Sequence, residues 1–159
     1  MSSPARLVRA YLDTSVYGGC YDEEFAPASR RVFRYVSEGR VLVLASAMVD
    51  DELIGAPESV KALRAGLTTA QVVECPETTE VTDLTEHYLR AGVLARKWWG
   101  DCTHVALASV HRADILVSWN FKHLVRFDKV RAFQGVNHMR GYPPISIVSP
   151  QEVLLEEDV

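Results

Sequence analysis

The 159-residue chain contains few cysteines and no long apolar run, and each absence excludes a class of protein. Its three cysteines, Cys20, Cys75 and Cys102, are an odd number without CxxC spacing, so the sequence encodes neither a disulfide framework nor a zinc site. The uncharged apolar run from Val41 to Val49 is too short to span a bilayer, and residues 1–10 do not resemble a signal peptide. We therefore expect a cytoplasmic protein with reduced thiols and no membrane partner.

The sequence also lacks an excess of positive charge. Its 17 Lys and Arg residues stand against 21 Asp and Glu, giving a formal net charge of -4. Proteins that coat nucleic acid by bulk electrostatics are usually basic overall, so the composition disfavours that class. The charge is segregated, however, because Asp128 is the only acid among five Lys and Arg residues between Phe121 and Arg140. The sequence thus allows one basic face.

A composition of 48% apolar and 24% charged residues is that of a globular protein with a core, and the length fits a single domain over residues 1–159.

Short apolar segments typical of buried strands alternate with amphipathic segments typical of helices. The expected strands are 7–12, 41–45, 70–75, 115–119 and 145–148. The expected helices are 27–38, 46–54, 57–65, 79–91, 101–111, most of 121–140, and a short tail helix begun by the capping box Ser149-Pro150-Gln151-Glu152. Residues around Gly18 and Gly19 are expected to form a loop. This alternation predicts an α/β fold with a mostly parallel sheet covered on both faces.

Two acidic residues are directed toward the core on helices whose inner face is otherwise apolar. On a helical wheel of about 100° per residue, Val105 and Ala108 fall within about 40° of Asp101. By the same geometry Glu52 lies about 60° from the apolar Val49. An acid in such a position is an N-cap, a member of an ion pair, or part of a carboxylate cluster that holds a cation.

Asp13 and Asn120 each follow an expected buried strand, where ligands collect in parallel sheets. Taken singly, Asp13 could be a turn or cap residue, Glu52 a solvated helix acid and Asp101 an N-cap. If the three acids converge, a pair of them about 4 Å apart repels by roughly 4 kcal/mol at an effective dielectric constant near 20. A divalent cation would remove that cost. An all-oxygen set without His or Cys suits Mg²⁺ or Mn²⁺, which support phosphodiester hydrolysis.

Several segments, in this order along the chain, resemble the PIN-domain ribonucleases, and among them the VapC-like toxins of bacterial type II toxin-antitoxin pairs. They are Tyr11-Leu12-Asp13-Thr14-Ser15, Asp51-Glu52-Leu53, Asp101-Cys102-Thr103-His104-Val105-Ala106-Leu107-Ala108, Leu116-Val117-Ser118-Trp119-Asn120-Phe121-Lys122-His123-Leu124 and Gly141-Tyr142-Pro143-Pro144.

The resemblance implies a three-layer α/β/α sandwich whose acidic pocket binds Mg²⁺ or Mn²⁺ and cleaves RNA with an activated water. By position, Asp13, Glu52 and Asp101 match the three acids of the family, and Asn120 stands at a fourth position that is often Asp. These four are therefore the expected catalytic and metal-binding residues. The resemblance also implies an RNA substrate, a cognate antitoxin and a homodimer.

Two other functions stay open. Asn120 brings no charge and the chain is acidic, which suits a catalytically weak or silent PIN-like module that binds RNA or a partner protein. Asp13 could instead be a phosphatase nucleophile, although Ser15 stands where haloacid-dehalogenase-like phosphatases carry a second Asp.

Further side chains allow both a functional and an ordinary interpretation. The segment Arg96-Lys97-Trp98-Trp99 could bind phosphates and stack on bases, or pack in a core or dimer seam. The basic segment 122–140 could contact RNA or be a solvated helix face. Thr14, Ser15 and His104 could orient a water or phosphate, or serve as capping hydroxyls and a buried histidine.

Overall fold

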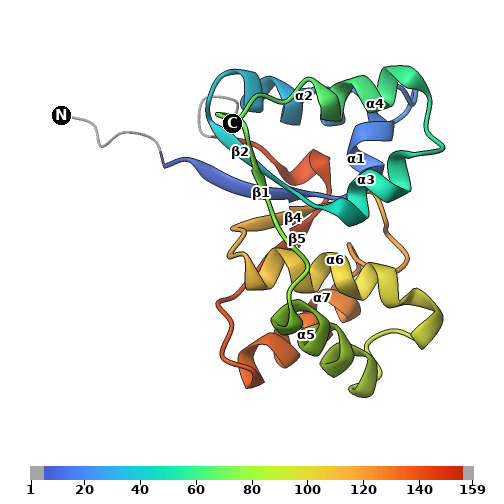
Figure 1. Cartoon of the computed structure of the whole chain (residues 1–159), viewed down its shortest axis with the longest axis vertical. Coiled ribbons are helices and arrows are strands. Elements are labelled where there is room, and N and C mark those ends of the chain that lie inside the picture. The colour runs from blue at the N-terminus through green and yellow to red at the C-terminus, as the bar shows by residue number, and fades with distance from the viewer. Residues whose placement is uncertain (1–5, 156–159) are drawn as a thin grey trace.

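A five-stranded parallel sheet forms the centre of the molecule, which a computed structural model describes over residues 6–155 (Figure 1). The strands are β1 (Val8–Leu12), β2 (Val41–Ala45), β3 (Val72–Glu74), β4 (Ile115–Val117) and β5 (Ser146–Val148). Their order is β3-β2-β1-β4-β5, and every neighbouring pair is parallel. Tyr11 of β1 lies opposite Leu44 of β2 and Leu116 of β4. The carboxyl ends of these three strands therefore lie side by side, and we call this the carboxyl edge of the sheet.

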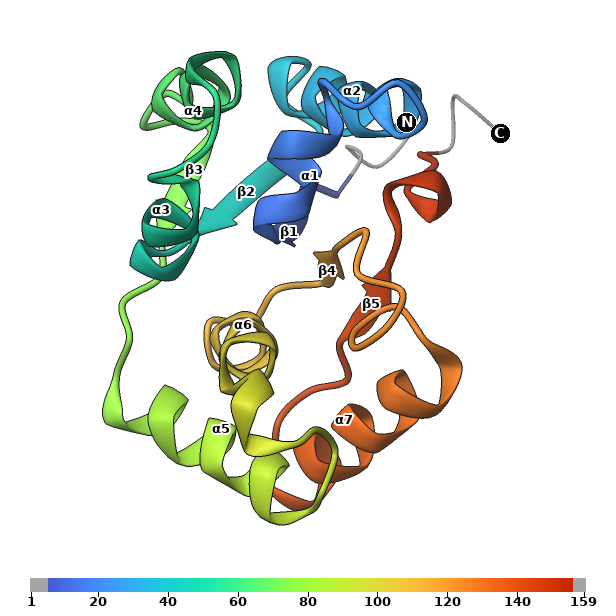
Figure 2. The ribbon, with the colours of Figure 1, turned by 90° about the vertical axis from the view of Figure 1, so that its right-hand side faces the viewer.

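Helices cover both faces of the sheet (Figure 2). One layer contains α1 (Thr14–Gly19), α2 (Ala26–Ser37), α3 (Ala47–Leu53) and α4 (Glu58–Ala65). The other contains α5 (Thr79–Arg90), α6 (Trp99–Val110) and α7 (Phe127–Met139). Single turns of 3-10 helix, η1 (Arg96–Trp98) and η2 (Pro150–Glu152), complete the described chain. The expected three-layer α/β/α sandwich is confirmed. Within residues 6–155 no helix has the length and apolarity needed to cross a membrane.

Helix α6 is the most enclosed helix of its layer. Every residue from Cys102 to Ser109 is buried, because α6 packs against both α5 and β4. A helix that is apolar on nearly all sides is stable only in such an enclosed position. Asp101 lies at the beginning of this buried stretch, so its carboxylate is held close to the core.

The structure departs from the sequence expectations at one loop. Residues around Gly18 and Gly19 form α1 rather than a loop. A Cβ on Gly19 would collide with the Ser29 Oγ and come within 2.7 Å of the Trp119 Nε1, so this glycine allows close packing instead of a turn. The expectation that residues 121–140 are mostly helical is confirmed by α7, which begins at Phe127. The preceding residues form turns.

Two local expectations agree with the structure. The capping box at Ser149 and Glu152 is confirmed, although the helix that it begins is a single 3-10 turn. Cys20, Cys75 and Cys102 are free and buried, as expected for reduced thiols.

Candidate metal centre

Asp13 is held at the end of β1 with one carboxylate oxygen fixed and the other directed inward. It stands at the N-cap position of α1, but its side chain makes no capping hydrogen bond, so the interpretation as a cap is wrong. Instead its Oδ2 accepts hydrogen bonds from the hydroxyls of Ser15, at 2.8 Å, and Ser118, at 2.7 Å. The Oδ1 lies 3.7 Å from the Nε2 of His104. Asp13 is only 7% exposed, so its charge has little water to stabilise it.

Glu52 approaches the same nitrogen of His104 as Asp13 does. Its Oε1 lies 2.6 Å from the His104 Nε2, and its Oε2 accepts a hydrogen bond of 2.7 Å from the Thr14 hydroxyl. One donor atom each from Asp13, Glu52 and His104 lies within 4.8 Å of the other two. We call these three residues the acid-imidazole cluster. The His104 nitrogen beside these two carboxylates is a neighbour that the all-oxygen set expected from the sequence did not include.

A chain of hydrogen bonds fixes the His104 ring from behind. The His104 Nδ1 lies 2.7 Å from the Tyr11 hydroxyl, which lies 2.8 Å from the Ser46 Oγ. Ser46 also caps α3 by accepting the backbone N–H of Val49. Tyr11, Ser46 and His104 are all buried. These hydrogen bonds connect the His104 ring of α6 to Tyr11 of β1 and, through Tyr11, to the N-cap of α3.

The charges around the His104 ring shift the pKa values of His104 and Glu52 toward their ionised forms. Burial works against protonation of His104, but its hydrogen bond to Glu52 and the negative charges of Asp13, Glu52 and Asp101 raise its pKa above the ordinary value. Burial likewise opposes ionisation of Glu52, but the hydrogen bonds from His104 and Thr14 and the positive charge of His104 lower its pKa. Both shifts favour an imidazolium beside a carboxylate. The imidazolium then donates Nε2–H to Glu52 and Nδ1–H to Tyr11.

Asp101 lies one helical turn before His104 and is paired with a second histidine. It is the third residue of α6, whose N-cap position is Trp98, so the expectation of an N-cap is wrong. Its Oδ2 lies 2.8 Å from the Nδ1 of His123, at hydrogen-bonding distance. The charge of Asp101 nevertheless contributes to the raised pKa of His104. Asp101 therefore belongs to the electrostatic surroundings of the acid-imidazole cluster.

Asn120 follows β4 at the same edge and organises a turn. Its Oδ1 accepts the backbone N–H groups of Lys122, at 3.2 Å, and His123, at 2.9 Å. His123 thus bonds Asn120 through its backbone and Asp101 through its ring. Of the four residues predicted from the sequence, Asp13 and Glu52 converge directly, whereas Asp101 and Asn120 are joined to each other through His123.

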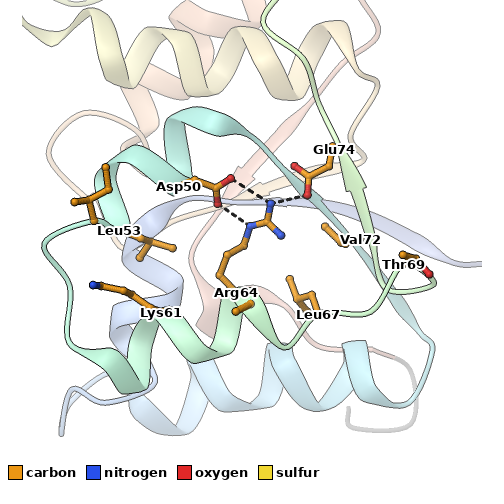
Figure 3. Close-up of a pocket in the computed structure, with 10 residues that line it drawn as sticks. Asp50, Leu53, Lys61, Arg64, Leu67, Thr69, Val72 and Glu74 are labelled. Atoms are coloured by element: carbon orange, nitrogen blue, oxygen red, sulfur yellow. Dashed lines mark hydrogen bonds and ion pairs between the residues drawn. The ribbon is translucent and has the colours of Figure 1, made fainter.

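A separate cavity of about 600 Å³ lies between α3, α4 and β3 (Figure 3). Across it, the Arg64 guanidinium bonds Asp50 at 2.9 Å and Glu74 at 2.5 Å. Asp50 and Glu52 are two residues apart on α3, so their side chains point in directions about 200° apart around the helix axis. The Arg64 ion pairs therefore take no part in the acid-imidazole cluster.

Comparison of the sequence with family models and with curated proteins finds no match. Solved structures do match. The crystal structure of VapBC2 from Rickettsia felis, bound to a DNA fragment from their promoter, aligns with a TM-score of 0.53 at 11% identity and covers 89% of this chain and 98% of that chain. The crystal structure of FitAcB from Neisseria gonorrhoeae aligns with a TM-score of 0.53 at 12% identity and covers 91% of this chain and 99% of that chain. The PIN-like fold implied by the sequence resemblance is therefore confirmed.

Proposed function

We propose that this protein is a metal-dependent ribonuclease of the VapC-like PIN type. In this proposal Asp13, Glu52 and Asp101 hold Mg²⁺ or Mn²⁺ at the carboxyl edge, beside Asn120. The observation that carries the proposal is the convergence of the Asp13 and Glu52 carboxylates on one buried imidazole. Two carboxylates this close disfavour each other's ionisation, and a bound cation would remove that penalty.

The donor set fits a divalent cation. Two carboxylate charges at most 4.8 Å apart repel by at least about 3.5 kcal/mol at an effective dielectric constant near 20. The raised pKa of His104 favours an imidazolium, whose charge would offset this repulsion when no metal is bound. The carboxylate oxygens suit both Mg²⁺ and Mn²⁺, and the imidazole nitrogen beside them suits Mn²⁺ better than the harder Mg²⁺.

When bound, a divalent ion would activate a water and neutralise charge that develops on the phosphodiester. The protein's own residues position the ligands for that ion. Ser15 and Ser118 hold one oxygen of Asp13 and leave the other directed to the cluster. Thr14 and His104 hold the two oxygens of Glu52. Such hydrogen bonds to metal ligands commonly change metal affinity by 10- to 100-fold.

The test is RNA cleavage with Mg²⁺ or Mn²⁺, with EDTA as the metal-free arm. We expect cleavage that stops in EDTA and is lost in Glu52→Gln and Asp101→Asn. The matched control is Asp50→Asn, which removes one acid from the same helix as Glu52 but faces Arg64. Cleavage that persists in Asp101→Asn, or is lost equally in Asp50→Asn, would contradict the proposal.

The biological role that we propose is the toxin of a bacterial toxin-antitoxin pair, acting in the cytoplasm as a homodimer. The sequence resemblance to VapC-like toxins supports this role, as does the fold shared with a structure of VapBC2. A small antitoxin encoded beside this chain should then copurify with it and inhibit cleavage. A neighbouring reading frame whose product neither binds nor inhibits the protein would count against the toxin role.

A second candidate is a catalytically weak or silent module that binds RNA or a partner protein. Asn120 favours it, because the Asn120 side chain brings no charge and its carbonyl oxygen already accepts two backbone N–H groups. Isothermal titration calorimetry separates the two candidates. Binding of RNA without binding of Mn²⁺ at millimolar concentration would support the silent module.

A further inference from the structure

A basic pocket of about 240 Å³ is lined by His123, whose ring is hydrogen-bonded to Asp101. Its other lining residues are 92–95, Trp98, Lys122, Arg126 and Lys129. We call this cavity, together with the residues that line it, the basic pocket. No Asp or Glu of residues 6–155 lines it. Three permanent cations therefore surround a small space in a protein whose net charge is negative.

His123 forms the boundary between the basic pocket and the candidate metal centre. Its ring lines the pocket, while its Nδ1 lies 2.8 Å from the Asp101 Oδ2. The ring of Trp98 packs against the ring of His123 with centroids 4.3 Å apart. A ligand in the pocket would thus lie one side chain away from Asp101.

Lys122 and Lys129 are positioned by an aromatic ring and a backbone carbonyl rather than by an acidic side chain of residues 6–155. The Lys129 Nζ donates to the backbone carbonyl of Val93 at 2.8 Å, and the Lys122 Nζ lies 5.6 Å from the centre of the Trp98 ring. The Lys97 Nζ lies 5.2 Å from the same ring. A carbonyl or an aromatic face fixes an ammonium group but leaves its full charge for a ligand. Arg126 does pair with Asp128 at 2.8 Å, but both partners are about half exposed, where such pairs are weak.

Three exposed aromatic residues neighbour pocket residues in the sequence. Trp99 is 54% exposed, Phe121 49% and Phe127 77%. They lie directly beside Trp98, Lys122 and Arg126 in the chain. Cations that follow a backbone, together with exposed rings on which unpaired bases can stack, are the combination that binds single-stranded nucleic acid.

We infer that the basic pocket binds a phosphate that flanks the scissile phosphodiester of a single-stranded RNA. The inference rests on the proposed nuclease function and adds a substrate subsite to it. The candidate metal centre and the basic pocket meet at Asp101 and His123, so one RNA strand can occupy both sites. The metal centre would take the phosphate that is cleaved, and the basic pocket would take the neighbouring phosphate. The basic face that the sequence analysis considered possible would thus contact the RNA substrate through Lys122, Arg126 and Lys129.

The test is binding of a fluorescein-labelled single-stranded RNA, followed by fluorescence anisotropy over a range of salt concentrations in EDTA. Without metal the strand stays intact, so binding is measured whether or not the protein is a nuclease. We expect Lys122→Gln/Lys129→Gln to raise Kd about tenfold. The slope of log Kd against log salt should fall by about 0.7, the value for one phosphate that the pocket no longer neutralises.

The matched control is Lys61→Gln/Arg90→Gln, which lowers the net charge equally by removing surface partners of Glu58 and Glu86. It should keep the wild-type salt slope. Because Lys129 also supports the backbone at Val93, Lys122→Gln alone provides a variant that keeps this hydrogen bond. That variant should show about half of the slope change.

Three results would overturn the inference. The first is an unchanged Kd and salt slope in Lys122→Gln/Lys129→Gln. The second is an increase in Kd for the control as large as that for this double variant. The third is displacement of the RNA by inorganic phosphate at the same concentration of phosphate groups. The last result would indicate a site for a free anion. Failure of the nuclease proposal is recognised separately. In that case the wild type shows the pocket-dependent salt slope but does not cleave RNA when Mg²⁺ or Mn²⁺ is restored.

Discussion

Tyr11→Phe tests whether the hydrogen-bond chain behind His104 supports metal binding. The substitution removes the hydroxyl of Tyr11, near the carboxyl end of β1, and keeps the ring. It leaves the His104 Nδ1, in a side chain 1% exposed, without its partner, while Ser46 keeps the N–H of Val49. An unsatisfied buried polar group costs about 2 kcal/mol. For a domain of this size we therefore expect the Tm to fall by about 4 to 8 °C.

The same change should weaken Mn²⁺ binding about tenfold, because His104 is then free to turn away from Glu52. Calorimetric titration of Mn²⁺ measures the affinity, and thermal unfolding in EDTA measures the stability. Tyr88→Phe is the matched control. Tyr88 is equally buried and hydrogen-bonded to Asn137 and Ser109, but it lies in α5, away from the acid-imidazole cluster.

Tyr88→Phe should lose a similar amount of stability and keep the wild-type affinity for Mn²⁺. If both variants lose stability and both keep full affinity, the chain through Tyr11 has only a structural role. The reasoning about His104 would then be refuted.

Three further predictions concern single groups. Tyr17→Phe should leave the free energy of unfolding in urea unchanged or raise it by about 1 kcal/mol, because the buried Tyr17 hydroxyl has no hydrogen-bond partner among the described residues; a clear loss of stability would show that it has one. Asn120→Asp should keep both backbone hydrogen bonds and strengthen Mn²⁺ binding by calorimetry, because it adds a charge near Asp101; an unchanged affinity would place residue 120 outside the metal centre. In EDTA, the raised pKa of His104 stabilises the fold fully below about pH 6.5, and this contribution is lost as pH rises through the folded pKa. The lowered pKa of Glu52 contributes fully above about pH 4.5 and is lost as pH falls through its folded value, so urea unfolding of His104→Gln should show a flatter pH profile than the wild type.

The sequence predicted those parts of the fold that depend on local patterns. The alternation of buried strands and amphipathic helices was sufficient for the parallel sheet and its two helical layers. The wheel position of Glu52 and the strand-end position of Asp13 were sufficient to bring these two acids to one edge. Both arguments use only neighbours along the chain.

The features that the sequence missed depend on contacts between distant segments. His104 bonds Glu52 across 52 positions, and His123 bonds Asp101 across 22, so neither partner could be read from spacing. Gly19 resembled a loop residue because its packing against Ser29 and Trp119 is not visible in the sequence. The segment Asn120-Phe121-Lys122-His123 did carry a local signal, since Asn often accepts N–H groups two and three residues later.

The central claim is that Asp13 and Glu52 hold a divalent cation with Asp101 nearby. Anomalous diffraction from a crystal soaked in Mn²⁺ tests it most directly, because the signal locates the ion itself. We predict an anomalous peak within coordination distance of carboxylate oxygens of both Asp13 and Glu52, and no such peak in Glu52→Gln. Well-ordered wild-type crystals without a peak there at millimolar Mn²⁺, or with an equal peak in Glu52→Gln, would contradict the claim.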